Sequence, residues 1–253
     1  SVRVRWCNRT YMITFAFSVI SIGNNAFGGA TSLAFVTFAA GSTLTSIGNF
    51  AFDGATALTS ITIPASVTTI GPQAFQNTTA LTFVTFDATS TLTTIGNYAF
   101  LNARALTSIT IPASVTSIPE GAFYGATALT SITIPASVTS IGDLAFQDAT
   151  SLASVYFLGN APATIGITPF LNTAPGAKAL IRSGTTGFTT SGTPALWNGL
   201  AVEVVADTPM PAQTPQLAET GASEPIALGV MASMSATLVA SGMFLLHRRR
   251  KLG

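Results

Sequence analysis

Apolar and polar residues alternate in a unit that recurs along most of the chain. The clearest copy reads LTSITIPASVTSIGDLAFQDAT and covers residues 129–150. In its first part, L-x-x-I-x-I, isoleucines alternate with Ser and Thr, which predicts a half-buried strand with Ile facing inward. Pro135 closes this strand because proline has no N–H to donate to a continuing ladder. The S-V-x-x-I stretch that follows predicts a return segment with two more inward side chains.

The last part of the unit, G-x-x-A-F, predicts a short helical turn that presents Ala and Phe to the core. It also shows the period of the repeat, because an Ile-Gly or Ile-Pro pair marks each copy and a phenylalanine follows five residues after the Ile. The intervals between marks are 23 to 25 residues. The marks are Ile22, Ile47, Ile70, Ile95, Ile118, Ile141 and Ile165, and the phenylalanines are Phe27, Phe52, Phe75, Phe100, Phe123, Phe146 and Phe170.

A unit of this length cannot bury its apolar face alone, whereas stacked copies cover one another at about 4.8 Å per layer. The repeat therefore predicts a solenoid, mainly β with one short helical or 3-10 turn in each copy. Its interior is expected to hold ladders of like residues, including a column of the seven phenylalanines. Two copies carry two extra residues, in segments that begin at Ala40 and Ala88, where a loop can absorb them.

The first 22 residues fit two interpretations. Three arginines within residues 3–9 precede an apolar run, as in a signal peptide. The stretch 13–23, however, lies in phase with residues 61–71, which favours a repeat that is entered midway. On that interpretation the chain lacks an N-terminal cap and is a fragment whose export signal lies upstream or is missing.

Composition changes abruptly after the repeats. Residues 207–216 form a Pro-rich spacer, which is expected to be extended. Three features follow in order: Leu217, Ala218, Glu219, Thr220 and Gly221; then an uncharged stretch, 226–246; then a basic tail, 247–251, that contains Arg248, Arg249, Arg250 and Lys251. The uncharged stretch is long enough to cross a bilayer of about 30 Å as a helix. The basic tail is expected to stay in the cytoplasm.

The repeat resembles the BspA-like leucine-rich-repeat family, whose consensus is close to LxxLxLPxSLxxIGxxAFxxCxxL. The resemblance runs from Ile13 to Phe170 and includes the P-x-S-V and I-G-x-x-A-F signatures. Ala55 and Ala126 stand where the family often has Cys, and the seventh unit is degenerate. Residues 177–200 resemble the segment that closes such solenoids, which implies a C-terminal cap.

The three C-terminal features resemble a Gram-positive sortase sorting signal of the L-A-x-T-G, LPXTG-like type. The resemblance implies that the helix and basic tail hold the exported chain in the membrane while a sortase attacks the carbonyl of Thr220. Thr220 is then joined to an amine of the cell wall, so it is a substrate and not a catalyst. The alternative is a permanent single-pass membrane anchor.

The sequence thus divides the chain into four predicted parts. They are the repeats at 1–173, the cap at 174–206, the spacer at 207–216 and the sorting signal at 217–253.

The inventory of reactive side chains argues against catalysis. The single cysteine, Cys7, excludes an intrachain disulfide and a cysteine metal cage. The single histidine, His247, follows the membrane segment and cannot join a Ser/His/Asp arrangement in the repeats. We expect no enzyme activity, no cofactor and no metal. The acids of the repeat loops are interpreted as solvated residues or helix-start caps: Asp53, Asp87, Glu120, Asp143 and Asp148.

Charged residues make up 8% of the chain, against about 25% in an ordinary soluble domain. Hydroxyl groups therefore supply most of the polar surface. The net charge of +1 depends on the four basic residues 248–251, and the rest of the chain is slightly acidic. This distribution gives no electrostatic footprint for nucleic acid.

The remaining candidate site is the concave face of the predicted sheet, on which most outward side chains are Ser and Thr. Phe35, Phe83 and Tyr156 interrupt it, with Thr37 and Thr85 beside the first two. Exposed aromatic residues on a polar sheet are typical anchors for a protein or glycan. The other interpretation is that the hydroxyls merely suit a pleated surface and the aromatics pack locally.

These observations predict a cell-wall-anchored surface protein that presents a repeat solenoid for adhesion to an extracellular protein or glycan. The expected partners are a sortase, a cell-wall acceptor, that extracellular ligand and, through the C-terminal helix, the membrane. The alternative is an inert spacer or a single-pass membrane protein, with binding carried by a missing N-terminal region.

Overall fold

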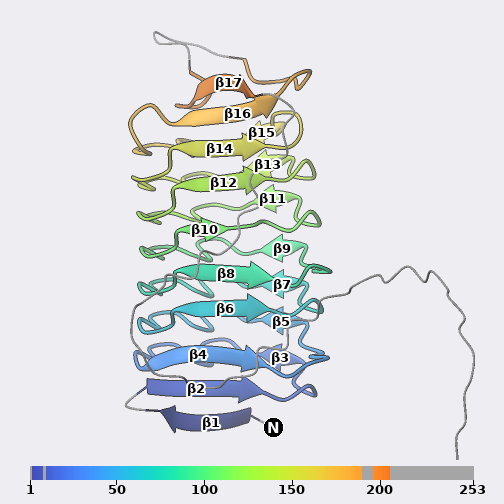
Figure 1. Cartoon of the computed structure of the whole chain (residues 1–253), viewed down its shortest axis with the longest axis vertical. Coiled ribbons are helices and arrows are strands. Elements are labelled where there is room, and N and C mark those ends of the chain that lie inside the picture. Colours follow the sequence, from blue (N-terminus) through green and yellow to red (C-terminus); the bar gives the residue numbers. More distant parts are fainter. Residues whose placement is uncertain (1, 8–9, 190–195, 206–253) are drawn as a thin grey trace, which may run out of the picture. The chain divides into compact units, whose positions relative to one another are not determined.

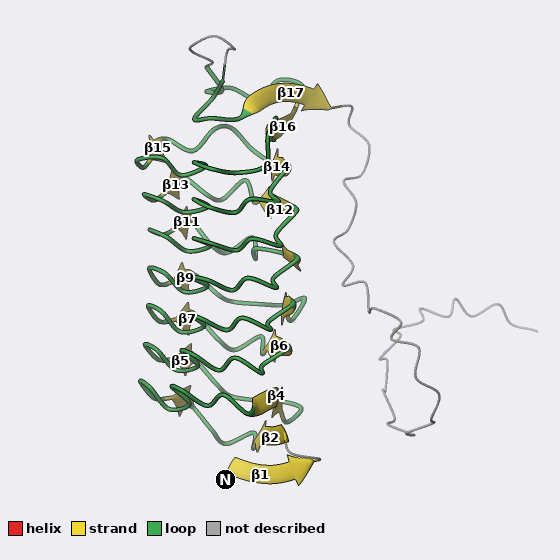
Figure 2. Cartoon of the chain, turned by 90° about the vertical axis from the view of Figure 1, so that its left-hand side faces the viewer, coloured by secondary structure: helices red, strands yellow, loops and turns green. Residues whose placement is uncertain are grey.

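The computed structural model describes residues 2–7, 10–189 and 196–205. The chain divides into two compact units, Ser1–Pro215 and Gln216–Gly253, and every described residue belongs to the first. These residues form a solenoid of stacked turns (Figure 1), as the repeat predicts. Figure 2 shows that the longer strands lie along one side of it and the two-residue return strands along the other.

The longer strands and the two-residue β10 form two sheets. The first contains β1 (Val2–Cys7), which pairs antiparallel, and the parallel strands β2 (Thr10–Phe15), β4 (Leu33–Phe38), β6 (Ser60–Ile63), β8 (Phe83–Phe86) and β10 (Ser108–Ile109). The second contains β12 (Ser131–Ile134), β14 (Ser154–Phe157), β16 (Lys178–Arg182) and β17 (Ala201–Val205). A bridge between Thr110 and Thr133 joins them. β16 and β17 extend the stack beyond the last clear repeat.

The beginning of the chain is in repeat register, and an additional strand lies along the edge of its first repeat strand. Ile13 of β2 lies beside Val36 of β4, as the phase of the repeat predicts. The expectation that no cap precedes it is wrong for the strand side, because β1 (Val2–Cys7) runs antiparallel along β2, from Val2 opposite Phe15 to Cys7 opposite Thr10. The alternating sequence VRVRWC is typical of such a strand.

The return strands also form two ladders. β3 (Ser21–Ile22), β5 (Ser46–Ile47), β7 (Thr69–Ile70) and β9 (Thr94–Ile95) form the first, and β11 (Ser117–Ile118), β13 (Ser140–Ile141) and β15 (Thr164–Ile165) form the second. Within a ladder the Gly after each Ile donates to the Ile of the preceding layer, as Gly96 does to Ile70 at 2.8 Å. Pro119 stands at the corresponding position after β11 and has no N–H. The proline therefore explains why the ladder divides between β9 and β11.

The predicted helical turn is wrong: the described residues contain no helix, and each G-x-x-A-F segment is a series of turns. The reason is its backbone, which is left-handed two residues before and two residues after each phenylalanine, as at Tyr98 (φ 58°) and Asn102 (φ 56°). A helix requires right-handed residues throughout. Alternate N–H groups instead donate to the next layer, for example Phe100 N to the Ala122 carbonyl at 2.9 Å.

The predicted phenylalanine column is confirmed. The seven rings, from Phe27 to Phe170, stack with centroids 5.2 to 5.5 Å apart and interplanar angles of 2° to 12°. The edge of Phe15 meets Phe27 at one end, and Trp197 lies tilted against Phe170 at the other. The five central rings have no exposed surface. The column is thus a continuous aromatic core that every layer shares.

Candidate binding face

The longer strands present one face to the interior and one outward. In β6, Ile61 and Ile63 are buried while Ser60 and Thr62 are exposed, because side chains alternate along a strand. Parallel pairing aligns the outward residues of successive layers into columns. We call the outward side chains of β2, β4, β6, β8 and β10 the strand face; its first column is Met12, Phe35, Ser60, Phe83 and Ser108.

The two predicted aromatic anchors of this sheet lie in the same column. Phe35 pairs with Ser60, and Ser60 pairs with Phe83, so the two phenylalanines are separated by two strand spacings, or about 10 Å. Phe35 is 47% exposed and Phe83 is partly buried. The small side chain of Ser60 lies between the two larger phenylalanine side chains in this column. The arrangement offers apolar surface for contact on a face that is mostly polar.

The predicted threonines bond with their neighbours on the same face. The hydroxyls of Thr14 and Thr37 are 2.9 Å apart, and those of Thr62 and Thr85 are 2.8 Å apart. Each pair spans two adjacent strands, which stabilises the sheet. Each bond uses one donor and one acceptor site, so part of the hydrogen-bonding capacity of these hydroxyls is taken up within the sheet.

Tyr156 does not join the phenylalanine pair. It lies on β14, in the second sheet, beside Thr133 and Leu180, and it is partly buried. Two strands, β10 and β12, stand between its strand and that of Phe83. The structure therefore places Phe35 and Phe83 in one column of the first sheet and Tyr156 in the second sheet.

Sequence reasoning missed two features of this side of the molecule. Met12 lies beside Phe35 and extends the apolar part of the column, and the alternation in its strand was a signal for this position. At the far end, Lys178 of β16 forms an ion pair of 2.6 Å with Glu203 of β17. No spacing in the sequence indicated that pair, because the two residues come from the closing segment and not from the repeats.

The acidic residues in and next to the G-x-x-A-F turns bond to neighbouring layers instead of capping helices. Oδ1 of Asp143 accepts the N–H of Ile167 at 2.6 Å. Asp148 accepts from the side-chain amide of Asn172 at 2.8 Å, and this bond and one from Tyr124 lower the pKa of Asp148. A hydrogen bond to Glu120 raises the pKa of Tyr98. Such bonds tie layers together, so these acids belong to the scaffold.

The predicted C-terminal signal lies outside the described residues. Its parts are the motif 217–221, the stretch 226–246 and the basic tail 247–251. Within the described ranges, no helix is long and apolar enough to span a membrane. The same ranges contain no group of three or more His, Cys, Asp or Glu side chains arranged to hold a metal ion.

Comparison with known proteins identifies the repeat. A model of the BspA type leucine rich repeat region, in six copies, matches residues 5–100 and 84–189. No curated protein matches the chain.

Two solved structures share the fold. A leucine rich repeat protein of T. pallidum, TpLRR, is 24% identical, with a TM-score of 0.56 over 68% of this chain and 86% of that one. A leucine rich cell surface protein from Faecalibacterium prausnitzii is 27% identical, with a TM-score of 0.57. The latter match covers 72% of this chain and 52% of the other, so this chain spans about half of that protein.

Proposed function

Because the chain belongs to the BspA-type leucine-rich repeat family, we propose that it is a cell-surface protein whose solenoid binds an extracellular protein or glycan. One similar structure is described as a cell surface protein, which supports this location. The observation that carries the binding role is the position of Phe35 and Phe83 in one column of the strand face, on either side of Ser60. Aromatic anchors at a surface dominate the energy of many interfaces. The proposal gives the chain no catalytic role.

We further propose that the chain is anchored to the cell wall through its C-terminal residues. The support is the order of the sequence: the LAETG motif at 217–221, the uncharged stretch 226–246 and the basic tail 247–251. A sortase would cleave after Thr220 and transfer it to a wall acceptor, which leaves the solenoid on the outer surface. The spacer 207–216 would separate the solenoid from the wall.

Binding is tested with the 253-residue chain against a panel of immobilised extracellular matrix proteins and a glycan array. The double variant Phe35→Ser, Phe83→Ser is expected to lose at least about tenfold in affinity for a partner that the natural chain binds, since hot-spot residues contribute 2 kcal/mol or more. The matched control is Leu158→Ser, which removes another exposed apolar residue. Equal binding by all three chains would favour the inert spacer.

Anchoring is tested on the mature protein taken from cell walls. Mass spectrometry of its C-terminal peptide is expected to end at Thr220, linked to a wall fragment. A peptide that retains Arg250 would show a membrane anchor without sorting. The Thr220→Ala variant, which removes the cleavage site, should remain in the membrane fraction.

A further inference from the structure

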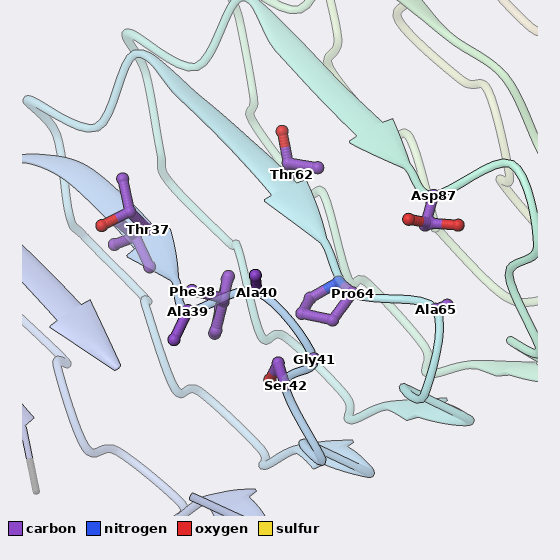
Figure 3. A pocket seen from close by; sticks show the side chains of 11 residues that line it. Thr37, Phe38, Ala39, Ala40, Gly41, Ser42, Thr62, Pro64, Ala65 and Asp87 are labelled. Carbon is purple, nitrogen blue, oxygen red and sulfur yellow. The ribbon is translucent and has the colours of Figure 1, made fainter. Parts of the chain in front are cut away.

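A hollow of about 480 Å³ lies at the edge of the strand face, where β4 and β6 end (Figure 3). Its shape follows from loop length. The segments after β4 and β8 each carry two extra residues, whereas Pro64 and Ala65 belong to the shorter loop between them. In Figure 3 Pro64 lies between Ala40 and Asp87. The volume is within the range of sites that hold small ligand groups, about 300 to 1,000 Å³.

Most of the lining is apolar, and the hydroxyls of Thr37, Ser42 and Thr62 each take part in at least one hydrogen bond within the chain. Pro64, Ala65, Phe38 and the neighbouring alanines 39 and 40 contribute carbon atoms. Thr37 and Thr62, which line the same hollow, bond to Thr14 and Thr85 through their hydroxyls. A sugar would need several free polar groups that converge on it. The lining suits a ligand with a hydrocarbon stem better than a carbohydrate.

Asp87 is the one charged residue among those that line the hollow. Its Oδ1 accepts the N–H of Thr89 at 2.9 Å and the hydroxyl of Thr89 at 2.8 Å. The bond from the backbone N–H has the larger effect and the bond from the hydroxyl the smaller one, and both lower the pKa of Asp87 below its ordinary value. The carboxylate is therefore charged at neutral pH. Among the described residues the only ion pair joins Lys178 and Glu203, so Asp87 has no basic partner there.

We infer that the hollow takes a basic side chain, lysine or arginine, from a protein partner. The methylene stem lies along Pro64 and Ala65, and the cationic head meets the carboxylate of Asp87. Thr37 and Thr62 belong to both the hollow and the strand face, so one partner can cover Phe35 and insert the basic residue. The inference rests on the proposed function and narrows it to a protein that presents a cation beside an apolar surface.

The test uses N-acetyl-arginine N-methylamide as the probe and its citrulline analogue, which has a similar shape without the charge. Methyl NMR of alanine-labelled 253-residue chain follows the methyl groups of Ala39, Ala40 and Ala65. We expect saturable shifts with an affinity in the millimolar range, since one exposed ion pair contributes little. The citrulline analogue should bind about fivefold more weakly or not at all. Equal shifts with both probes, or no saturable shift, would overturn the inference.

Two variants complete the test. Asp87→Asn keeps an oxygen that accepts from Thr89, so the loop is preserved while the charge is lost; it should bind the arginine probe as weakly as the natural chain binds the citrulline analogue. Asp143→Asn, in a G-x-x-A-F turn, should leave the affinity for the arginine probe unchanged. Equal affinity in Asp87→Asn and the natural chain would contradict the assignment. Because the probe does not depend on Phe35 or Phe83, failure here leaves the strand-face experiment intact, and the reverse also holds.

Discussion

The rings of Phe75 and Phe100 lie 5.3 Å apart and within 4° of parallel, and neither has exposed surface. Each ring therefore contacts the layers above and below it in the column. Removing one ring leaves a cavity in the shared core that neighbouring layers cannot fill without moving.

We predict that Phe100→Ala lowers the free energy of unfolding by about 3 to 5 kcal/mol. Phe35→Ala, at a position that is 47% exposed, should lower it by less than about 1 kcal/mol. Urea denaturation followed by circular dichroism measures both. Similar losses for the two variants would mean that the column does not carry the stability of the solenoid.

Gly96 and Gly23 occupy equivalent positions in two repeats, yet they should respond differently to substitution. A Cβ at Gly96 would overlap the backbone nitrogen of Pro72, whereas one at Gly23 would meet nothing within 4 Å. Gly96→Ala should therefore destabilise the chain by about 1 to 3 kcal/mol, because two layers must separate. Gly23→Ala should change stability by no more than about 0.5 kcal/mol. Thermal unfolding distinguishes the two, and equal melting temperatures would contradict the close approach of layers at Gly96.

The bond between Asn172 and Asp148 predicts a dependence of stability on pH. This bond is the main cause that lowers the pKa of Asp148 in the folded chain below 3.8, the ordinary value. Its contribution is therefore complete above that value and is lost as the pH falls through the lower, folded-state pKa. The size is less than about 1 kcal/mol because the carboxylate is partly exposed.

The Asp148→Asn variant checks this sign. The natural chain should be more stable than the variant at about pH 6, and the difference should shrink toward about pH 3 as the carboxylate is protonated. A difference in melting temperature that stays constant across this range would show that the charge on Asp148 does not matter.

Much of the fold followed from the spacing of Ile and Phe in the repeat. Phe52 and Phe75 recur at the repeat interval, and a solenoid is the arrangement that brings residues at this interval into contact. The predicted helical turn failed because a short G-x-x-A-F segment fits several backbone paths. Tyr98 and Leu144 adopt left-handed backbone, which neither side chain favours, so their residue types did not indicate it.

The strand face was partly predictable. Alternation along β4 and β8 placed Phe35 and Phe83 outward, and the repeat placed them in one column. Their different exposure and the pairing of the threonine hydroxyls depend on the packing of adjacent strands. The hollow depends on three loops from successive layers, and only their relative lengths were visible beforehand. Asp87 consequently looked like any other solvated loop acid.

The central claim is that a partner covers the strand face, and hydroxyl-radical footprinting of the chain with its bound partner tests it most directly. Phe35 and Leu171 are similarly exposed, at 47% and 45%, but Leu171 lies in the last turn segment, away from the strands. The partner should reduce oxidation of Phe35 severalfold and leave Leu171 unchanged. If Phe35 is oxidised equally in the free and bound chains, the strand face is not the binding surface.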